Sequence, residues 1–125
     1  CPATGFSFDL ERIMAALEAE RSLPAVSGPD VLLIDFSPDK RAAHRLARVL
    51  RERGCSVARD IIKRELAGSL AYARETAIRS VVVLGMADLP SGTVLVHDVR
   101  TETRRTVPLE AFERALARGE APWIV

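Results

Sequence analysis

The chain has 125 residues, of which 48% are hydrophobic and 28% charged, and its formal net charge is +1. These values are typical of one folded domain with an apolar core; they exclude a disordered chain and the strongly basic composition of many nucleic-acid-binding domains. Two cysteines are too few for a disulfide scaffold, and no apolar run approaches the length of a membrane span or a signal core. We therefore expect a soluble, cytoplasmic domain.

The chain begins with a segment that we expect to be separate from the rest. Apolar residues recur there at spacings of three and four and predict a helix over residues 9–21, capped by Ser7 or Asp9. Residues 23–29 contain two prolines and a glycine, which predict a linker and a domain boundary.

Beyond the linker, strand and helix patterns alternate. Residues 31–36 form a continuous apolar run, as in a strand buried on both faces. A helix follows, capped by Ser37 or Asp39 with Pro38 at its first position, and it ends at Gly54. The later elements are predicted as a strand at 55–60 in which Cys55 is buried, a helix at 66–77, a strand at 81–85, a hairpin of strands at 93–99 and 104–108, and a helix at 109–117. This order predicts an α/β fold, a three-layer α/β/α arrangement around a mixed sheet of about five strands.

No motif indicates a catalytic centre in this stretch of chain. Neither the turn after residues 31–36 nor the turn after residues 81–85 has the glycine-rich sequence that leads into a helix in a phosphate-binding loop. His44 and His97 have no cysteine or second histidine at metal-ligand spacing, which argues against zinc. We therefore predict no catalytic residue, no cofactor and no metal here.

Three aspartates, Asp35, Asp60 and Asp98, lie at or near predicted strand ends, where open α/β sheets place ligand-binding groups. Such carboxylates could form an acid–base set or a metal site. They could instead cap turns and pair with arginines, and the 18 Lys and Arg residues favour this second interpretation.

Basic residues are the remaining signal for function. Those of the first long helix are mixed with acidic residues, as on a solvated face. Loops and hairpins carry binding groups more often, so the candidate RNA or partner contacts are Lys63, Arg64, Arg100, Arg104 and Arg105. Trp123 is expected to pack back onto the domain, with a partner contact as the alternative.

The order of elements and three local motifs resemble the anticodon-binding domain of class II aminoacyl-tRNA synthetases. The motifs are Leu50-Arg51-Glu52-Arg53-Gly54, Leu70-Ala71-Tyr72-Ala73 and Val81-Val82-Val83-Leu84-Gly85. The resemblance covers about residues 30–117 and is moderately specific. It implies the fold of that domain for residues 30–125.

The segment before the linker resembles motif 3 of the histidyl group of those enzymes, a glycine-rich strand and helix that close the catalytic domain. The matching residues are Gly5, Phe6, Asp9, Glu11 and Arg12. In the family the motif's arginine supports the ATP phosphates, so the resemblance implies that Arg12 contacts nucleotide. Residues 1–22 are then the expected tail of a synthetase-like core, and residues 23–29 the linker.

Two departures from the synthetase pattern bear on the function that the resemblance implies. Asp9 stands where a second glycine is usual, and its charge would repel nucleotide phosphates. Ala67-Gly68-Ser69 stands where a Lys or Gln pair is frequent. Both favour a non-catalytic paralogue, the regulatory subunit of ATP phosphoribosyltransferase, which acts in histidine biosynthesis and responds to histidine.

Each of these assignments implies its own partner. The regulatory subunit would pair with a short-form catalytic phosphoribosyltransferase. The first alternative is the C-terminal domain of a histidyl-tRNA synthetase, which would bind tRNA(His). The second is a generic α/β interaction domain. We expect the full-length parent to be a homo-oligomer without membrane contact.

Overall fold

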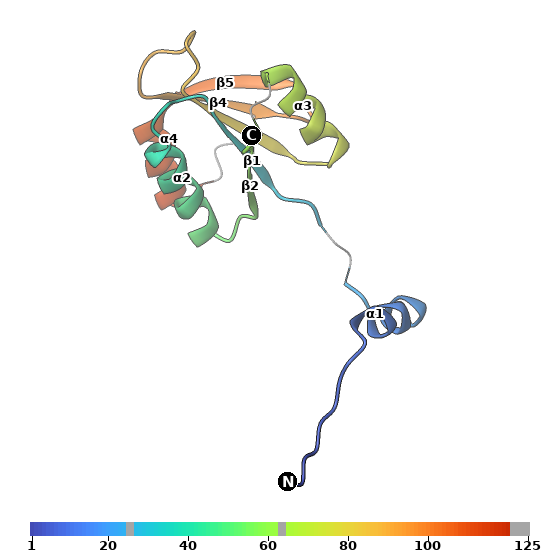
Figure 1. Ribbon diagram of the computed structural model, residues 1–125. Helices are drawn as coiled ribbons and strands as arrows, with labels where there is room; N and C mark the ends of the chain where they lie inside the picture. The colour runs from blue at the N-terminus through green and yellow to red at the C-terminus, as the bar shows by residue number, and fades with distance from the viewer. Residues whose placement is uncertain (25–26, 63–64, 121–125) are drawn as a thin grey trace.

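The computed structural model describes residues 1–24, 27–62 and 65–120, and Figure 1 shows how its elements are arranged. The predicted contact residues Lys63 and Arg64, and Trp123, lie outside this part of the chain. The elements in chain order are α1 (Leu10–Ala19), β1 (Val31–Asp35), α2 (Arg41–Glu52), β2 (Val57–Arg59), α3 (Leu66–Glu75), β3 (Ser80–Leu84), β4 (Thr93–Asp98), β5 (Thr103–Pro108) and α4 (Leu109–Ala117). Across the described residues, no helix has both the length and the apolar character required to cross a membrane.

The five strands form one mixed sheet in the order β2-β1-β3-β4-β5. Strand β1 is parallel to both β2 and β3, whereas β4 is antiparallel to β3 and β5. Helices α2 and α4 cover one face and α3 covers the other, so that the sheet is the middle of three layers (Figure 1). The predicted three-layer fold is confirmed.

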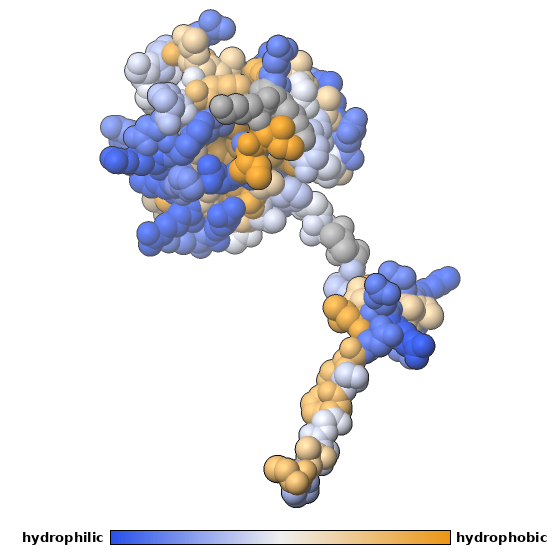
Figure 2. All heavy atoms as spheres, viewed as in Figure 1, coloured by the Kyte–Doolittle hydropathy of each residue, from blue (hydrophilic) through white to orange (hydrophobic). Residues whose placement is uncertain are grey.

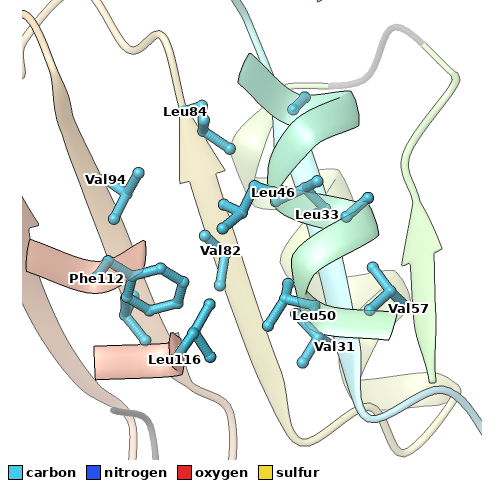
Figure 3. Close-up of a cluster of buried hydrophobic side chains, with 13 residues drawn as sticks. Val31, Leu33, Leu46, Leu50, Val57, Val82, Leu84, Val94, Phe112 and Leu116 are labelled. Carbon is cyan, nitrogen blue, oxygen red and sulfur yellow. The ribbon is translucent and has the colours of Figure 1, made fainter. Parts of the chain in front are cut away.

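The central strands are apolar on both sides because both faces of the sheet are covered. In β1, Val31 and Leu33 face the core under α2 and α4, and their neighbours Leu32 and Ile34 face α3. Figure 3 shows the first core, in which Phe112 of α4 is completely buried. Truncation of such a buried aromatic to alanine typically lowers the free energy of unfolding by about 3–5 kcal/mol.

Several predicted boundaries are wrong by a few residues. Helix α2 begins at Arg41 rather than at Pro38, because the Ser37 backbone and hydroxyl both donate to Asp35 in a turn before the helix. The predicted cap Asp39 accepts a hydrogen bond from the Arg41 backbone N–H at 2.9 Å, although Lys40 occupies the N-cap position. The helix end at Gly54, which has a φ of +83°, is confirmed.

Strand β2 is shorter than predicted because only Val57–Arg59 pair with β1. Cys55 therefore precedes the strand and is half-buried, and burial raises the pKa of its thiol. Helix α3 also ends early, since Ala77 adopts a φ of +55° that an α-helix does not allow.

The segment before the linker forms one exposed helix, α1, which lies apart from the sheet in Figure 1. Asp9 is its N-cap, as predicted, and accepts a hydrogen bond from the Arg12 backbone N–H at 3.2 Å. No residue of α1 is buried, and residues 1–9 form no strand. A strand needs a neighbour with which to pair, so the assignment of residues 1–22 to the tail of a synthetase-like core stays a prediction.

Candidate functional site

A pocket of about 750 Å³ lies beyond the carboxyl ends of β1 and β2. Open α/β sheets bind ligands at this edge, where the loops that follow parallel strands come together. The turn after β1, the loop after β2 and the residue before α3 supply its walls. The lining residues are Ile34, Asp35, Phe36, Ser37, Pro38, Lys40, Arg59, Asp60, Ile61, Ile62 and Glu65.

Asp35, the last residue of β1, has a carboxylate that is 6% exposed. Its Oδ1 accepts hydrogen bonds from the Ser37 backbone N–H at 2.9 Å and from the Ser37 hydroxyl. Lys40 donates from Nζ to the Asp35 carbonyl oxygen at 2.6 Å and lies 3.8 Å from Oδ2. Oδ2 itself is buried and has no hydrogen-bond partner among the described residues. The Asp35 carboxylate is therefore shielded from solvent, fixed by Ser37 and placed beside the positive charge of Lys40.

Asp60, the first residue after β2, also lines the pocket. Its carboxylate accepts a hydrogen bond from the Ser69 hydroxyl of α3 and another from the Ile62 backbone N–H at 3.2 Å. The loop after β2 is thereby fixed to α3. Asp35 and Asp60 both accept hydrogen bonds from turn N–H groups, as the favoured interpretation predicts. Among the described residues neither pairs with an arginine, and the cation beside Asp35 is Lys40.

The third predicted aspartate, Asp98, is at the other end of the sheet. Strand β4 is antiparallel to β3, and Asp98 is paired with Ser80, the first residue of β3. Its carboxylate accepts hydrogen bonds from the backbone N–H groups of Thr101 at 3.0 Å and Arg100 at 2.8 Å. The bond from Thr101 is the largest cause of the lowered pKa of Asp98. The three aspartates therefore do not form one site.

Gly85 positions the turn that carries Asp35, which sequence reasoning did not foresee. It follows β3 with a φ of +70°, and a Cβ built there would lie 2.4 Å from the Ser37 backbone nitrogen. Only glycine allows this approach without displacement of the turn. The glycine at the end of the Val-Val-Val-Leu run was the available signal.

The rim of the pocket is apolar. Phe36 is 42% exposed, Ile61 is 82% exposed and Ile62 is 57% exposed, and all three line the pocket. Figure 2 shows that apolar surface is gathered in one area on the visible face of this domain. Sequence reasoning also missed this rim, although two adjacent isoleucines beyond the end of a strand were a visible signal.

The described basic residues of the hairpin do not form one patch. Arg100 is exposed in the turn after β4. Arg104 is paired with His97 and Arg105 with Val96, so that their side chains point to opposite faces of β5. Their role as RNA or partner contacts stays a prediction, as does that of Lys63 and Arg64.

The arginines of α2 and its C-cap residue Arg53 do more than form a solvated face. Arg45 pairs with Glu113 of α4 at 2.9 Å. Arg51 donates to the carbonyl oxygen of Val57 in β2 at 2.9 Å, and Arg53 to that of Ala117 in α4 at 2.7 Å. These contacts connect α2 to its neighbours.

His97 is buried on the face of the sheet that α3 covers, with 1% of its surface exposed. Neither ring nitrogen has a hydrogen-bond partner among the described residues, and Nε2 lies 3.8 Å from Oε2 of Glu102. Burial, and then the charge of Arg104, lower the pKa of His97, so the ring is neutral at pH 7. His44 is exposed and faces the Arg59 guanidinium at 3.2 Å. No group of three metal-ligating side chains occurs in the described part of the chain.

Arg12, the predicted nucleotide contact, is 87% exposed and forms an ion pair with Asp9 at 3.3 Å. Asp9 is therefore used twice within α1, as the helix cap and as the partner of Arg12. Gly5, Phe6 and Glu11 are exposed beside them. The nucleotide role of this segment stays a prediction.

A family model described as the anticodon binding domain matches residues 30–118. The chain belongs to the anticodon-binding domain family. The resemblance inferred from the sequence, over about residues 30–117, is thereby confirmed.

Curated proteins of two kinds are similar to this chain. The chain is 42% identical over 110 residues to the ATP phosphoribosyltransferase regulatory subunit of Syntrophotalea carbinolica, a match that covers 88% of the chain and 25% of that protein. It is 31% identical over 111 residues to the histidine–tRNA ligase of Pyrococcus furiosus, with 87% of the chain and 26% of that protein covered. The chain thus spans about a quarter of the length of these relatives.

The fold is also that of solved synthetase structures. The crystal structure of histidyl-tRNA synthetase from Nostoc sp. PCC 7120 aligns with a TM-score of 0.61 at 19% identity, over 87% of this chain and 27% of that one. At this level of identity the likeness establishes the fold alone.

Proposed function

We propose that the chain is the C-terminal part of a regulatory subunit of ATP phosphoribosyltransferase. The observation that carries this proposal is the 42% identity to a regulatory subunit over 110 residues. In this role the domain supports a cytoplasmic histidine-biosynthesis complex and performs no chemistry of its own.

The site is consistent with a protein-binding role. The described lining of the pocket has both carboxylates and cationic side chains, and exposed apolar side chains form its rim, which suits contact with protein side chains. The described hairpin arginines, which could neutralise RNA phosphates, are divided between two faces of β5. Asp9 next to Arg12 also disfavours nucleotide phosphates at α1.

The regulation itself belongs to the whole protein. We propose that the full-length parent is a homo-oligomer, pairs with a short-form catalytic subunit and binds histidine in a synthetase-like pocket upstream of this chain. Histidine would then favour an inhibited state of the complex. Such coupling is reciprocal, so that assembly with the catalytic subunit would change the affinity for histidine by the same factor.

The second candidate is the anticodon-binding domain of a histidine–tRNA ligase. It is favoured by the 35% identity over 112 residues to the ligase of Moorella thermoacetica. In that case the described arginines and the pocket would contact tRNA(His), and the parent would be an enzyme.

Activity measurements on the full-length parent separate the two functions. When the parent is mixed with a short-form catalytic subunit, the rate at which the catalytic subunit transfers the phosphoribosyl group to ATP should rise. Added histidine should lower that rate. The parent alone should attach no histidine to tRNA(His). Charging of tRNA(His), together with no effect on phosphoribosyl transfer, would overturn the proposal in favour of the ligase.

A further inference from the structure

We propose that the turn between β4 and β5, residues 99–102, is a pH-sensitive latch. The ion pair between Glu102 and Arg74 of α3 holds the turn closed while His97 is neutral, and the turn opens when the His97 ring gains a proton. This inference goes beyond the proposed function and does not depend on it, because the groups that carry it all lie within residues 65–120.

Glu102 joins the turn to a helix that is distant in the sequence. Its Oε1 accepts a hydrogen bond from the guanidinium of Arg74, in the last turn of α3, at 2.6 Å. Glu102 itself adopts a φ of +56°, a left-handed conformation that is unfavourable for a residue with a side chain. The contact with α3 therefore helps to hold a turn that contains a strained residue.

The latch closes over a buried histidine. His97 is 1% exposed, and Oε2 of Glu102 lies 3.8 Å from its Nε2, which is too far for a hydrogen bond. Neither ring nitrogen has a hydrogen-bond partner among the described residues. A buried polar group without a partner is unfavourable, and a buried charge without one is far more so. The closed turn therefore suits the neutral ring and not the protonated one.

The charges around His97 do not compensate a proton on its ring. The charged groups that act on the ring from the described elements are Arg74 of α3, Arg104 of β5, Glu102 of the turn and Asp98 of β4. The facing residue on β3, Val81, is uncharged. Glu102 is already bonded to Arg74, and the Asp98 carboxylate accepts two turn N–H groups. Burial, and then the charge of Arg104, lower the pKa of His97.

A proton on His97 therefore favours the open turn. In the open turn water reaches the ring, and a hydrated histidine has a pKa of about 6.5, above that of the buried ring. The closed turn is fully stable above this open-state pKa and loses stability as the pH falls through it. Glu102 and Arg74 are the part of the cover that moves most easily, because their side chains are 54% and 55% exposed and exposed ion pairs contribute little stability.

Hydrogen–deuterium exchange of the full-length parent at pH 8 and pH 5 tests the latch. Protection factors, which remove the direct effect of pH on exchange, are measured for peptides that span residues 99–102 and for β1. The Val99 N–H, which donates to the Arg79 carbonyl oxygen at 3.0 Å, reports the opening of the turn. The protection of the turn should be lower than that of β1 at both pH values, because the turn opens locally. It should fall at least about threefold from pH 8 to pH 5, and an open-state pKa of about 6.5 limits the fall to about thirtyfold.

Three variants assign the effect to its residues. His97→Leu cannot titrate and should remove the dependence of turn protection on pH. Glu102→Gln keeps the length of the side chain but loses the ion pair with Arg74, so the protection of the turn should already be lower at pH 8. Glu113→Gln, the matched change in the ion pair between α4 and Arg45 of α2, should exchange in the turn as the wild type does.

Four results would overturn the proposal. Turn protection that is unchanged or higher at pH 5 would show that the turn stays closed over the protonated ring. Equal protection of the turn and of β1 would show that the turn opens only when the whole domain unfolds. The wild-type pH dependence in His97→Leu would assign the effect to another group, and wild-type protection in Glu102→Gln would remove the ion pair from the latch. Each of these results leaves the proposed function intact, since none of them concerns a partner of the parent.

Discussion

Replacement of Gly85 by alanine tests how the pocket is built. A Cβ at this position would lie 2.4 Å from the Ser37 nitrogen and 2.8 Å from the Ser37 Cβ, at a backbone φ of +70°. A left-handed conformation costs an L-residue about 1–2 kcal/mol, and overpacking typically adds about 1–3 kcal/mol. Gly85→Ala should therefore lower the free energy of unfolding by about 2–5 kcal/mol, the sum of the two effects.

Gly54→Ala is the matched control. Gly54 has a φ of +83°, but no atom would lie within 4 Å of an added Cβ. Its replacement should lower the free energy of unfolding by the conformational part alone, about 1–2 kcal/mol. Urea denaturation of the chain, followed by circular dichroism, measures both values. Equal losses in the two variants would refute the close contact between Gly85 and the turn that carries Asp35.

The remaining predictions concern the other end of the sheet. The change in the free energy of unfolding from wild type to His97→Leu should favour the variant more at pH 5 than at pH 8. Burial lowers the pKa of His97, so the wild type loses stability as the pH falls below the unfolded-state pKa of about 6.5, whereas leucine does not titrate. Melting curves at the two pH values that shift equally in variant and wild type would contradict this. Asp98→Ala should lower the free energy of unfolding by about 1–2 kcal/mol near pH 7, because two turn N–H groups lose their acceptor. The difference in free energy of unfolding between the wild type and Asp98→Ala should shrink in acid as the wild-type carboxylate is protonated. A difference that stays constant down to pH 2 would contradict the role of the ionised carboxylate in this turn. Arg104→Ala and Arg105→Ala in the full-length parent should leave the affinity for tRNA(His) and its salt dependence unchanged in filter binding, whereas a lower salt slope in either variant would support the ligase.

The fold was predictable because its signals are local and repeat along the chain. The apolar run at residues 31–36 indicated a strand covered on both faces, and the alternation with helices indicated parallel neighbours. Boundaries were less accurate where tertiary contacts decide them. Strand β2 stops at Arg59 because its pairing with β1 stops there, and this depends on residues far away in the sequence.

The candidate site was predictable only in part. The positions of Asp35 and Asp60 at strand ends were visible in the sequence, but Asp98 had the same appearance and lies at the opposite edge. The antiparallel direction of β4, which separates them, matters only once the strands are placed side by side. The exposure of Ile61, like the contact of Gly85 with Ser37, depends on how distant loops meet.

Sedimentation of the full-length parent with each partner at physiological salt tests the central claim most directly. One sample contains the short-form catalytic subunit and the other contains tRNA(His). A regulatory subunit should co-sediment with the catalytic subunit at micromolar concentration and leave the tRNA free. Co-sedimentation with tRNA(His) alone would contradict the account and identify the parent as a histidine–tRNA ligase.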